Sequence, residues 1–280
     1  MRLSIRHQIS IGIGEGAARA ALHLLMTPQD HAGQTVREWT LEAPGIDSAT
    51  GFLDGFGNRA HLVTQTRPEA EMILTATGIV ETTDRSGVVG KSKADPVPAL
   101  FLRVTELTRA EPGLIEGLSG HNRIARLHAL MARVAESPGA SDGDGEEQAQ
   151  GGYEGPDGQS QSQSQSMPAG DGGEDAPGPA LSPVEMAHRF IAGARALRIP
   201  ARYVSGYLAE AGDAPRVHAW AEAWDDAIGW IGFDPSLQIC PVEAHVRVAC
   251  GLDAISAAAV RAVPAAGAAV PLALVIETAQ

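Results

Sequence analysis

The first residues of the chain alternate between apolar and polar side chains with a period of two, which predicts a β-strand with one wet face. One face collects Leu3, Ile5, His7, Ile9, Ile11 and Ile13, and the other collects Arg2, Ser4, Arg6, Gln8 and Ser10. Further runs rich in strand formers, 35–42, 61–66 and 71–81, are separated by turn dipeptides such as Pro44-Gly45. This spacing predicts an antiparallel β domain over residues 1–115.

After Gly120 the apolar residues follow the period of a helix, and Leu127, Leu130, Met131 and Val134 fall on one face of a predicted helix at 121–136. A second helix is predicted at 183–198, because Ser182 suits the N-cap, Pro183 the first helical position and Glu185 the third. Strands are then expected at 201–209, 216–224, 229–234, 245–250 and 272–277. Helices followed by antiparallel strands predict an α+β domain over residues 120–277.

A low-complexity segment, 139–180, separates the two helices. It consists mainly of Gly, Ser, Gln, Pro and acidic residues, with Tyr153 and Met167 as its large apolar side chains. Such a segment cannot bury enough surface to offset the entropy of ordering it, so we expect it to be disordered. It carries nine Asp and Glu and no Lys or Arg, which leaves about −4 of the net charge of −13 for the rest of the chain. That value gives no electrostatic reason to expect nucleic acid or an anionic membrane as a partner.

The chain shows no signal for secretion or membrane insertion. Its N-terminus has no continuous hydrophobic run after a basic start, so a cytoplasmic location is expected. The uncharged stretch 262–276 is too short to span a bilayer, and Pro264 and Pro271 interrupt it. The two cysteines, Cys240 and Cys250, lack the spacing of a zinc site and are expected to be small buried side chains in a reducing compartment.

One histidine and one aspartate are spaced for acyl-transfer chemistry. His218 lies on the strand 216–224, on the same face as Trp220, Glu222 and Trp224. A hairpin centred on residue 226 places His218 opposite Asp234, and one centred on residue 227 makes them diagonal neighbours. A carboxylate beside an imidazole fixes its tautomer, as the base of a Cys or Ser nucleophile requires. The same pair also occurs as a plain cross-strand hydrogen bond, and spacing alone does not separate the two interpretations.

Longer motifs around this pair resemble the bacterial branch of the transglutaminase-like superfamily, which has a papain-like fold and a cysteine nucleophile. They are ALRIPARYVSGYL, HAWAEAW and GWIGFDPS. RLSIRHQISI, LLMTPQDHAGQTVREWTLE and DGFGNRAHLV look like the β-rich region that precedes the catalytic domain in that branch. The resemblance covers nearly the whole chain except the low-complexity segment. It implies a Cys-His-Asp site for acyl transfer or amide hydrolysis, with His218 and Asp234 as two of its members and with neither a metal nor an organic cofactor.

The residue that should attack is replaced in this sequence. Members of the family usually carry C-Q-D-x-A-H at the start of the helix, and aligning Ala187 and His188 with that motif puts Pro183 at the cysteine. Proline offers neither a thiolate nor a backbone N–H for an oxyanion. Further departures follow HVRVACG, where the family tends to show R-D-Y-x-D-V-x-P-V-R-G. They are Leu252 for the arginine, Ala254 for the tyrosine, Ser256 for the second acid and Ala262 for the final glycine.

These departures favour a catalytically inactive pseudoenzyme that acts by binding a protein or peptide ligand, with an active transglutaminase-like relative as one expected partner. The alternative is an active amide hydrolase or acyl transferase with a substituted nucleophile. Ser182 adjoins the replaced position but suits a helix cap, and Cys240 follows Asp234 by six residues but suits a buried thiol. A third interpretation makes the acidic segment 139–180 a module that recruits other proteins. We expect Cys250 in the core and His188 as a buried histidine with a hydrogen-bond partner.

Overall fold

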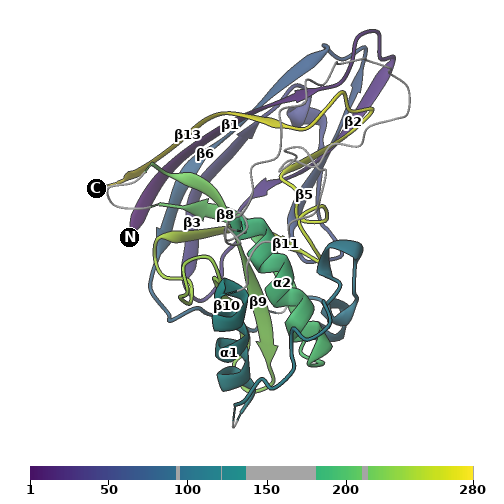
Figure 1. The fold of residues 1–280 in the computed structure, drawn as a ribbon. Coiled ribbons are helices and arrows are strands. Elements are labelled where there is room, and N and C mark those ends of the chain that lie inside the picture. Colours follow the sequence, from purple (N-terminus) through teal and green to yellow (C-terminus); the bar gives the residue numbers. More distant parts are fainter. Residues whose placement is uncertain (93–94, 121, 137–180, 210–213, 280) are drawn as a thin grey trace, which may run out of the picture.

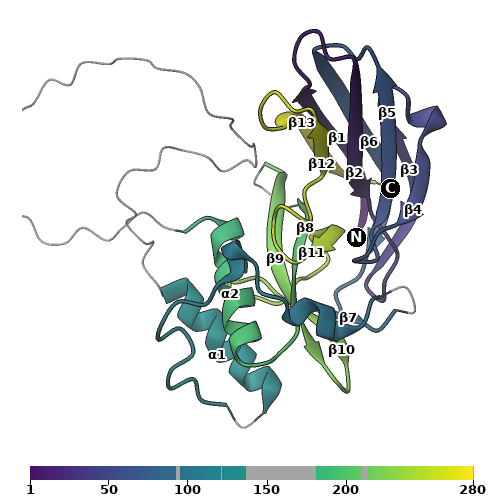
Figure 2. The same cartoon turned by 90° about the vertical axis from the view of Figure 1, so that its right-hand side faces the viewer.

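Residues 1–92, 95–120, 122–136, 181–209 and 214–279 are described in a computed structural model. A β-sandwich of two sheets lies above a third sheet that carries two helices on one side (Figures 1 and 2). The segment 139–180, which the composition predicts to be disordered, lies outside the described residues. No helix of the described part is both long and apolar enough to cross a membrane.

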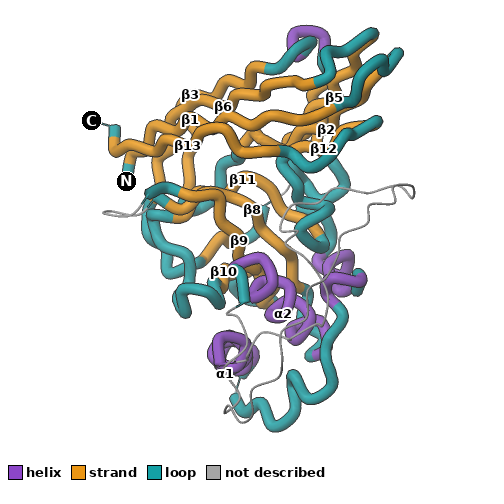
Figure 3. Tube along the Cα trace, turned by 45° about the horizontal axis from the view of Figure 1, so that its top comes forward, coloured by secondary structure: helices purple, strands orange, loops and turns teal. Residues whose placement is uncertain are grey.

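The sandwich is built from strands of the N-terminal region, which face each other as two layers (Figure 3). These strands are β1 (Arg2–Gly12), β2 (Arg19–Thr27), β3 (Gln34–Glu42), β4 (Thr50–Leu53), β5 (Arg59–Thr66) and β6 (Glu71–Thr82). One sheet has the order β13-β1-β6-β3 and the other β12-β2-β5-β4. The apolar face predicted for the first strand is buried between them, where Ile9 and Ile11 pack with Leu22, Val63 and Leu74.

The last strands of the chain return to this sandwich. β12 (Val260–Val263) pairs with β2, and β13 (Val270–Thr278) pairs with β1. Conversely, β7 (Val88–Gly90) belongs to the N-terminal region by sequence but pairs with β10 in the third sheet. The predicted boundaries, 1–115 and 120–277, stay a prediction, and the pairings show that strands from each range complete sheets built mainly by the other. An apolar pattern shows that a segment is a strand but does not show which sheet completes it.

The third sheet and its helices form the α+β unit expected from the sequence, and the predicted fold class is confirmed. The sheet order is β11-β8-β9-β10-β7, with β8 (Ala201–Leu208), β9 (Arg216–Asp225), β10 (Gly229–Phe233) and β11 (His245–Gly251). The helices are α1 (Arg123–Glu136) and α2 (Pro183–Ala196), and short 3-10 turns cover Ile46–Ser48, Pro98–Leu102 and Glu106–Thr108. α2 packs on the small side chains Ala219, Ala221 and Ala223 of β9, so the helix can approach the sheet closely.

The start of α2 is fixed by a reciprocal capping box. The Ser182 hydroxyl accepts a hydrogen bond from the Glu185 amide at 3.3 Å, and the Glu185 carboxylate accepts one from the Ser182 amide at 2.7 Å. Pro183 occupies the first helical position, where a missing N–H costs no helical hydrogen bond. One turn later the buried His188 accepts a hydrogen bond from the Ala254 amide at 3.0 Å. The helix start and the partner of His188 agree with the sequence prediction.

Candidate active site

The hairpin of β9 and β10 brings His218 and Asp234 together. Its register pairs Gly229 with Asp225 and Phe233 with Ala221, which centres the turn on residue 227 and is the second of the two registers expected. His218 and Asp234 are therefore diagonal neighbours, and His218 Nε2 lies 2.6 Å from Asp234 Oδ2. Both side chains are fully buried. They lie on the face of the sheet opposite α2, because the alternate residues of β9 contact the helix.

Asp234 accepts hydrogen bonds on both carboxylate oxygens. Oδ1 receives the Ser236 amide at 3.0 Å, the Ser236 hydroxyl at 2.7 Å and the Leu237 amide at 3.2 Å. Oδ2 receives His218 and, at 3.1 Å, His245 Nε2. Burial alone would raise the pKa of Asp234, but the hydrogen bonds from His218, His245 and Ser236 outweigh it and hold the pKa well below its ordinary value. The carboxylate is therefore ionised at neutral pH.

His245 is a member of this cluster that the sequence did not reveal. Its Nδ1 accepts a hydrogen bond from the Val242 amide at 3.2 Å, so the ring proton sits on Nε2 and points at Asp234. The motif HVRVACG marked the strand, but nothing in it showed that the histidine would reach Asp234. In the sheet, β8 and β9 lie between β10 and β11, so the segment that joins β10 to β11 crosses over both strands. The contact depends on this crossover.

The trio His218, Asp234 and His245 could offer three ligand atoms to a metal ion. A tetrahedral zinc with bonds of about 2.0–2.2 Å holds neighbouring ligand atoms about 3.3 Å apart, and each ligating nitrogen must be free of its proton. His218 Nε2 and Asp234 Oδ2 are only 2.6 Å apart, and the Val242 contact leaves the proton of His245 on the nitrogen that would bind the metal. The geometry fits a hydrogen-bonded trio and does not fit a zinc site.

The second ring nitrogen of His218 is free to accept a hydrogen bond. With Nε2 donating to Asp234, Nδ1 carries the lone pair of the neutral ring. This atom is buried and has no hydrogen-bond partner among the residues that the structure describes. The pair is thus arranged as an oriented general base with a buried, unpaired accepting nitrogen.

Family comparisons agree with this geometry. A model of the bacterial transglutaminase-like N-terminal region matches residues 3–81. A model of the transglutaminase-like superfamily core matches residues 182–235, a range that includes Pro183, His218 and Asp234. The chain is a transglutaminase-like superfamily protein. The family predicted from the sequence motifs is confirmed.

Two relatives are similar to this transglutaminase-like chain. The "Uncharacterized protein ML0607" of Mycobacterium leprae is 33% identical over 100 residues, a match that spans 33% of this chain and 35% of that protein. A crystal structure of a Cytophaga hutchinsonii protein, named as a cysteine protease, superimposes with a TM-score of 0.65 at 19% identity. That superposition covers 99% of this chain and 89% of the other, so the two share the fold over nearly their whole length.

Pro183, which the sequence motif aligns with the family cysteine, lies at the first position of α2. The C-terminal end of α2 is tied to the start of β8, because Arg195 donates to the Ala201 carbonyl at 2.9 Å. α2 packs along the sheet, with Pro183 in its first turn at the other end of the helix. The structure brings His218, Asp234 and His245 into contact and leaves Pro183 outside that cluster.

The two alternative nucleophiles have other contacts. The Ser182 hydroxyl donates to the Glu185 carboxylate at 2.7 Å and accepts from the Glu185 amide, so its hydrogen bonds serve the helix cap. Cys240 is half-buried against the core beneath α2. Burial raises the pKa of the Cys240 thiol, and the nearby Asp84 raises it further. Cys250 is buried beside Val204 and Trp220, as expected.

Three of the four other departures from the family pattern lie beside α2. The Leu252 carbonyl accepts from Arg195 at 2.8 Å, the Ala254 amide donates to His188, and the Ser256 hydroxyl donates to Asp253 at 2.9 Å. These three positions therefore flank the helix on which the family carries its nucleophile. Ala262 lies farther away, on β12 in the sandwich.

A buried ionic cluster shares the sheet face of His218. Glu222 is fully buried and accepts hydrogen bonds from Arg202 Nε at 2.6 Å and Arg247 Nε at 2.8 Å. Arg202 also reaches Asp95 at 3.0 Å and lies 4.0 Å above the ring of Trp230. Burial would raise the pKa of Glu222, but the two guanidinium groups outweigh it and lower the pKa to about 2. Arg247 therefore depends on Glu222 for charge balance, whereas Arg202 has both Glu222 and Asp95.

These titrations predict that acid lowers the melting temperature in two ranges. Burial lowers the pKa of His7 and His188 from 6.5 to about 4, so their stabilising effect is complete above pH 6.5 and is lost as the pH falls toward 4. The pKa of Glu222 falls from 4.5 to about 2, so its contribution is complete above pH 4.5 and is lost as the pH falls through 2. Thermal unfolding, followed by circular dichroism at a series of pH values from 8 to 2, measures both losses of stability. A melting temperature constant from pH 7 to pH 4 would contradict the part assigned to the histidines.

Proposed function

We propose that this protein is a catalytically inactive member of its superfamily that acts by binding a protein or peptide ligand. The observation that carries the proposal is Pro183 at the first position of α2, where the family motif has its cysteine. The base that such a cysteine would use is intact, since His218 is oriented by Asp234 and its Nδ1 has no partner among the described residues. A base without a group to deprotonate supports binding rather than turnover.

The replacement removes two contributions to acyl transfer. A thiol at a helix N-terminus has a lowered pKa, and the backbone N–H at the same place can donate to the developing oxyanion. Proline supplies neither. Loss of the attacking member of a triad leaves a rate about 10³–10⁴-fold above that of the uncatalysed reaction in water, which comes from binding and oxyanion contacts. The missing N–H lowers this residual rate further.

Substituted nucleophiles are less well supported by the contacts. Ser182 uses its hydroxyl in the capping box, and the thiol of Cys240 has a raised pKa that disfavours the thiolate. Neither side chain is hydrogen-bonded to His218. We place the protein in the cytoplasm, where its two free thiols would stay reduced, and propose an active transglutaminase-like relative as one partner.

We predict that the native protein shows only background activity. Glutamine-plus-amine and peptide substrates, together with a cysteine-directed activity probe, would be tested on the native chain, Cys240→Ala, Ser182→Ala and Pro183→Cys. Native turnover that is lost in Cys240→Ala would replace the proposal with a relocated thiol, and turnover lost only in Ser182→Ala would assign the serine. Labelling gained by Pro183→Cys would show that the base still serves a nucleophile at the helix start. Its matched control is Pro183→Cys with His218→Ala, in which labelling should fall back.

A further inference from the structure

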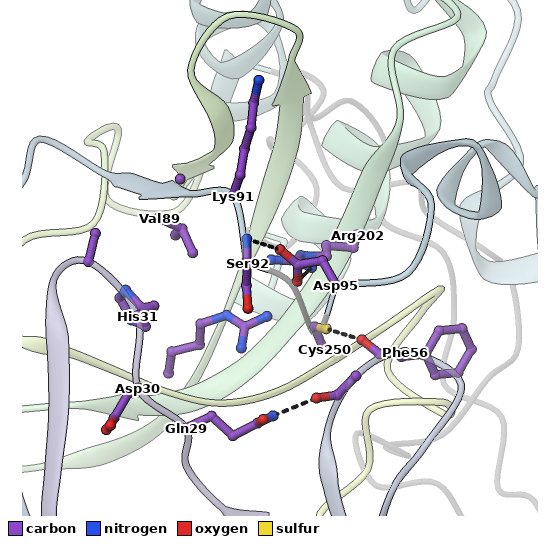
Figure 4. A pocket seen from close by; sticks show the side chains of 14 residues that line it. Gln29, Asp30, His31, Phe56, Val89, Lys91, Ser92, Asp95, Arg202 and Cys250 are labelled. Carbon is purple, nitrogen blue, oxygen red and sulfur yellow. Dashed lines mark hydrogen bonds and ion pairs between the residues drawn. The ribbon is translucent and has the colours of Figure 1, made fainter.

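A cavity of about 400 Å³ lies between the sandwich and the third sheet, and neither His218 nor Asp234 lines it. Its lining comes from the segment after β2, the turn before β5 and the segment around β7, together with Arg202, Arg247 and Cys250 of the third sheet (Figure 4). The volume falls in the range of about 300–1,000 Å³ that is typical of small-molecule sites. The cavity therefore has the size of a binding site and is distinct from the His-Asp pair.

Arg247 supplies hydrogen-bond donors to this cavity. Its backbone is held on both sides by Gln34, which accepts from the Arg247 amide at 2.8 Å and donates to the Arg247 carbonyl at 2.9 Å. Its Nε is bound to Glu222, and the polar group beside the rest of the guanidinium is the weakly accepting thiol of Cys250. No oxygen acceptor is hydrogen-bonded to its Nη1 or Nη2 among the described residues. The side chain is nine-tenths buried, so these donors are held in place.

His31, in the segment after β2, supplies a second donor to the cavity. Its Nδ1 accepts a hydrogen bond from the Gly33 amide at 3.2 Å. Burial, assisted by the positive charge of Arg247, lowers the pKa of His31 to about 4, so the ring is neutral at pH 7 and its proton is on Nε2. Within the described part of the chain, this N–H has no hydrogen-bonded acceptor.

Both carboxylates that line the cavity accept hydrogen bonds from the chain. Asp95 accepts from Arg202 at 3.0 Å and from the Ser92 amide at 2.9 Å. Asp30 accepts from the Val36 amide at 2.7 Å, and its carboxylate points away from Arg202 (Figure 4). The cavity thus presents unengaged donors, which a ligand rich in acceptor oxygens would satisfy.

We propose that this cavity binds the carboxylate of a small molecule or of a peptide chain end. Arg247 presents its two Nη groups to the two carboxylate oxygens, and His31 donates a further hydrogen bond from Nε2. A guanidinium fork matches a planar carboxylate in two parallel hydrogen bonds. The buried charges already balance, because Arg202 and Arg247 face Glu222 and Asp95. A singly charged carboxylate therefore adds one uncompensated negative charge to the cavity and a doubly charged phosphate adds two, so the carboxylate is the better fit.

Calorimetric titration of the full chain tests this assignment with three probes: N-acetyl-trialanine with a free carboxylate, the same peptide as its C-terminal amide, and inorganic phosphate. The free acid should bind at least about tenfold more tightly than the amide or phosphate, since only it satisfies the guanidinium fork with one charge. Absence of binding by the acid at millimolar concentration would overturn the proposal. Equal binding of acid and amide, or tighter binding of phosphate, would overturn it as well. The inference does not depend on the inactivity of the His-Asp pair.

Substitutions locate the binding in this cavity. Arg247→Lys keeps a positive charge for Glu222 but removes the fork, and His31→Ala removes the second donor; each should weaken binding of the free acid by about tenfold. Arg37→Lys, on the exposed side of β3, is the matched control and should leave the affinity unchanged. If circular dichroism shows that Arg247→Lys is unfolded, His31→Ala decides the question. Unchanged affinity in a folded His31→Ala would then exclude this cavity.

Discussion

Replacing Glu222 with glutamine is expected to lower the free energy of unfolding by about 3–5 kcal/mol, because it breaks a buried ion pair from one side only. Arg202 and Arg247 would both stay buried, and Asp95 alone would remain to balance them. The amide also turns one acceptor oxygen into a donor that faces a guanidinium group. Chemical denaturation of the purified variant measures the loss.

The matched control is Glu111→Gln. Glu111 also accepts hydrogen bonds from a guanidinium group, that of Arg189 at 2.7 Å, but about half of its side chain is exposed to solvent. Water can solvate Arg189 when the Glu111 charge is removed, so Glu111→Gln should lower the free energy of unfolding by only about 0–1 kcal/mol. A loss of similar size in both variants would show that burial of Glu222 contributes nothing beyond an ordinary surface pair.

The contacts that the sequence predicted are those made by neighbouring parts of the chain. His218 and Asp234 are close together because they belong to one hairpin, and alternation along the strand placed them on the same face. The exact register stayed open, because it depends on whether the turn is centred on residue 226 or on residue 227. The cap of α2 was equally predictable, since Ser182 and Glu185 lie within a single helical turn.

Contacts between distant parts of the chain were not predictable in the same way. The alternation put Glu222 on the face of His218, but its partners Arg202 and Arg247 come from strands 20 and 25 residues away. His245 contacts Asp234 although β8 and β9 lie between β11 and β10 in the sheet. The chain crosses over these two strands between β10 and β11. One sequence gives the type of each element and leaves open the order in which strands assemble.

The catalytic roles of the candidate residues remain predictions. The structure shows that His218 and Asp234 are hydrogen-bonded and that Pro183 begins α2. A buried His-Asp hydrogen bond is compatible both with a base that has lost its nucleophile and with a structural contact. Labelling of Pro183→Cys separates these two cases, since only an intact base activates a thiol placed at the helix start.

Removing residues 260–280 is expected to unfold the N-terminal sandwich, although the apolar pattern assigned this segment to the other domain. The truncated chain would lose β13, which pairs with β1 from Leu3–Thr278 to Ser10–Val270, and β12, which pairs with β2. Loss of Leu274 and Ile276 would also uncover the core around Leu3 and Ile5. Two unpaired strand edges and an open core favour aggregation.

Size-exclusion chromatography and thermal unfolding measure this effect, and the matched control removes only residues 279 and 280. The control should behave as the full chain does, because Ala279 lies beyond β13 and contributes one backbone hydrogen bond, to the Arg2 carbonyl. The longer truncation should elute as aggregates or lose its cooperative transition. A monodisperse truncated protein that melts within a few degrees of the full chain would show that β1 and β2 do not need their outer partners. The sandwich would then be complete with six strands, and the returning segment would be an addition to an independently stable domain.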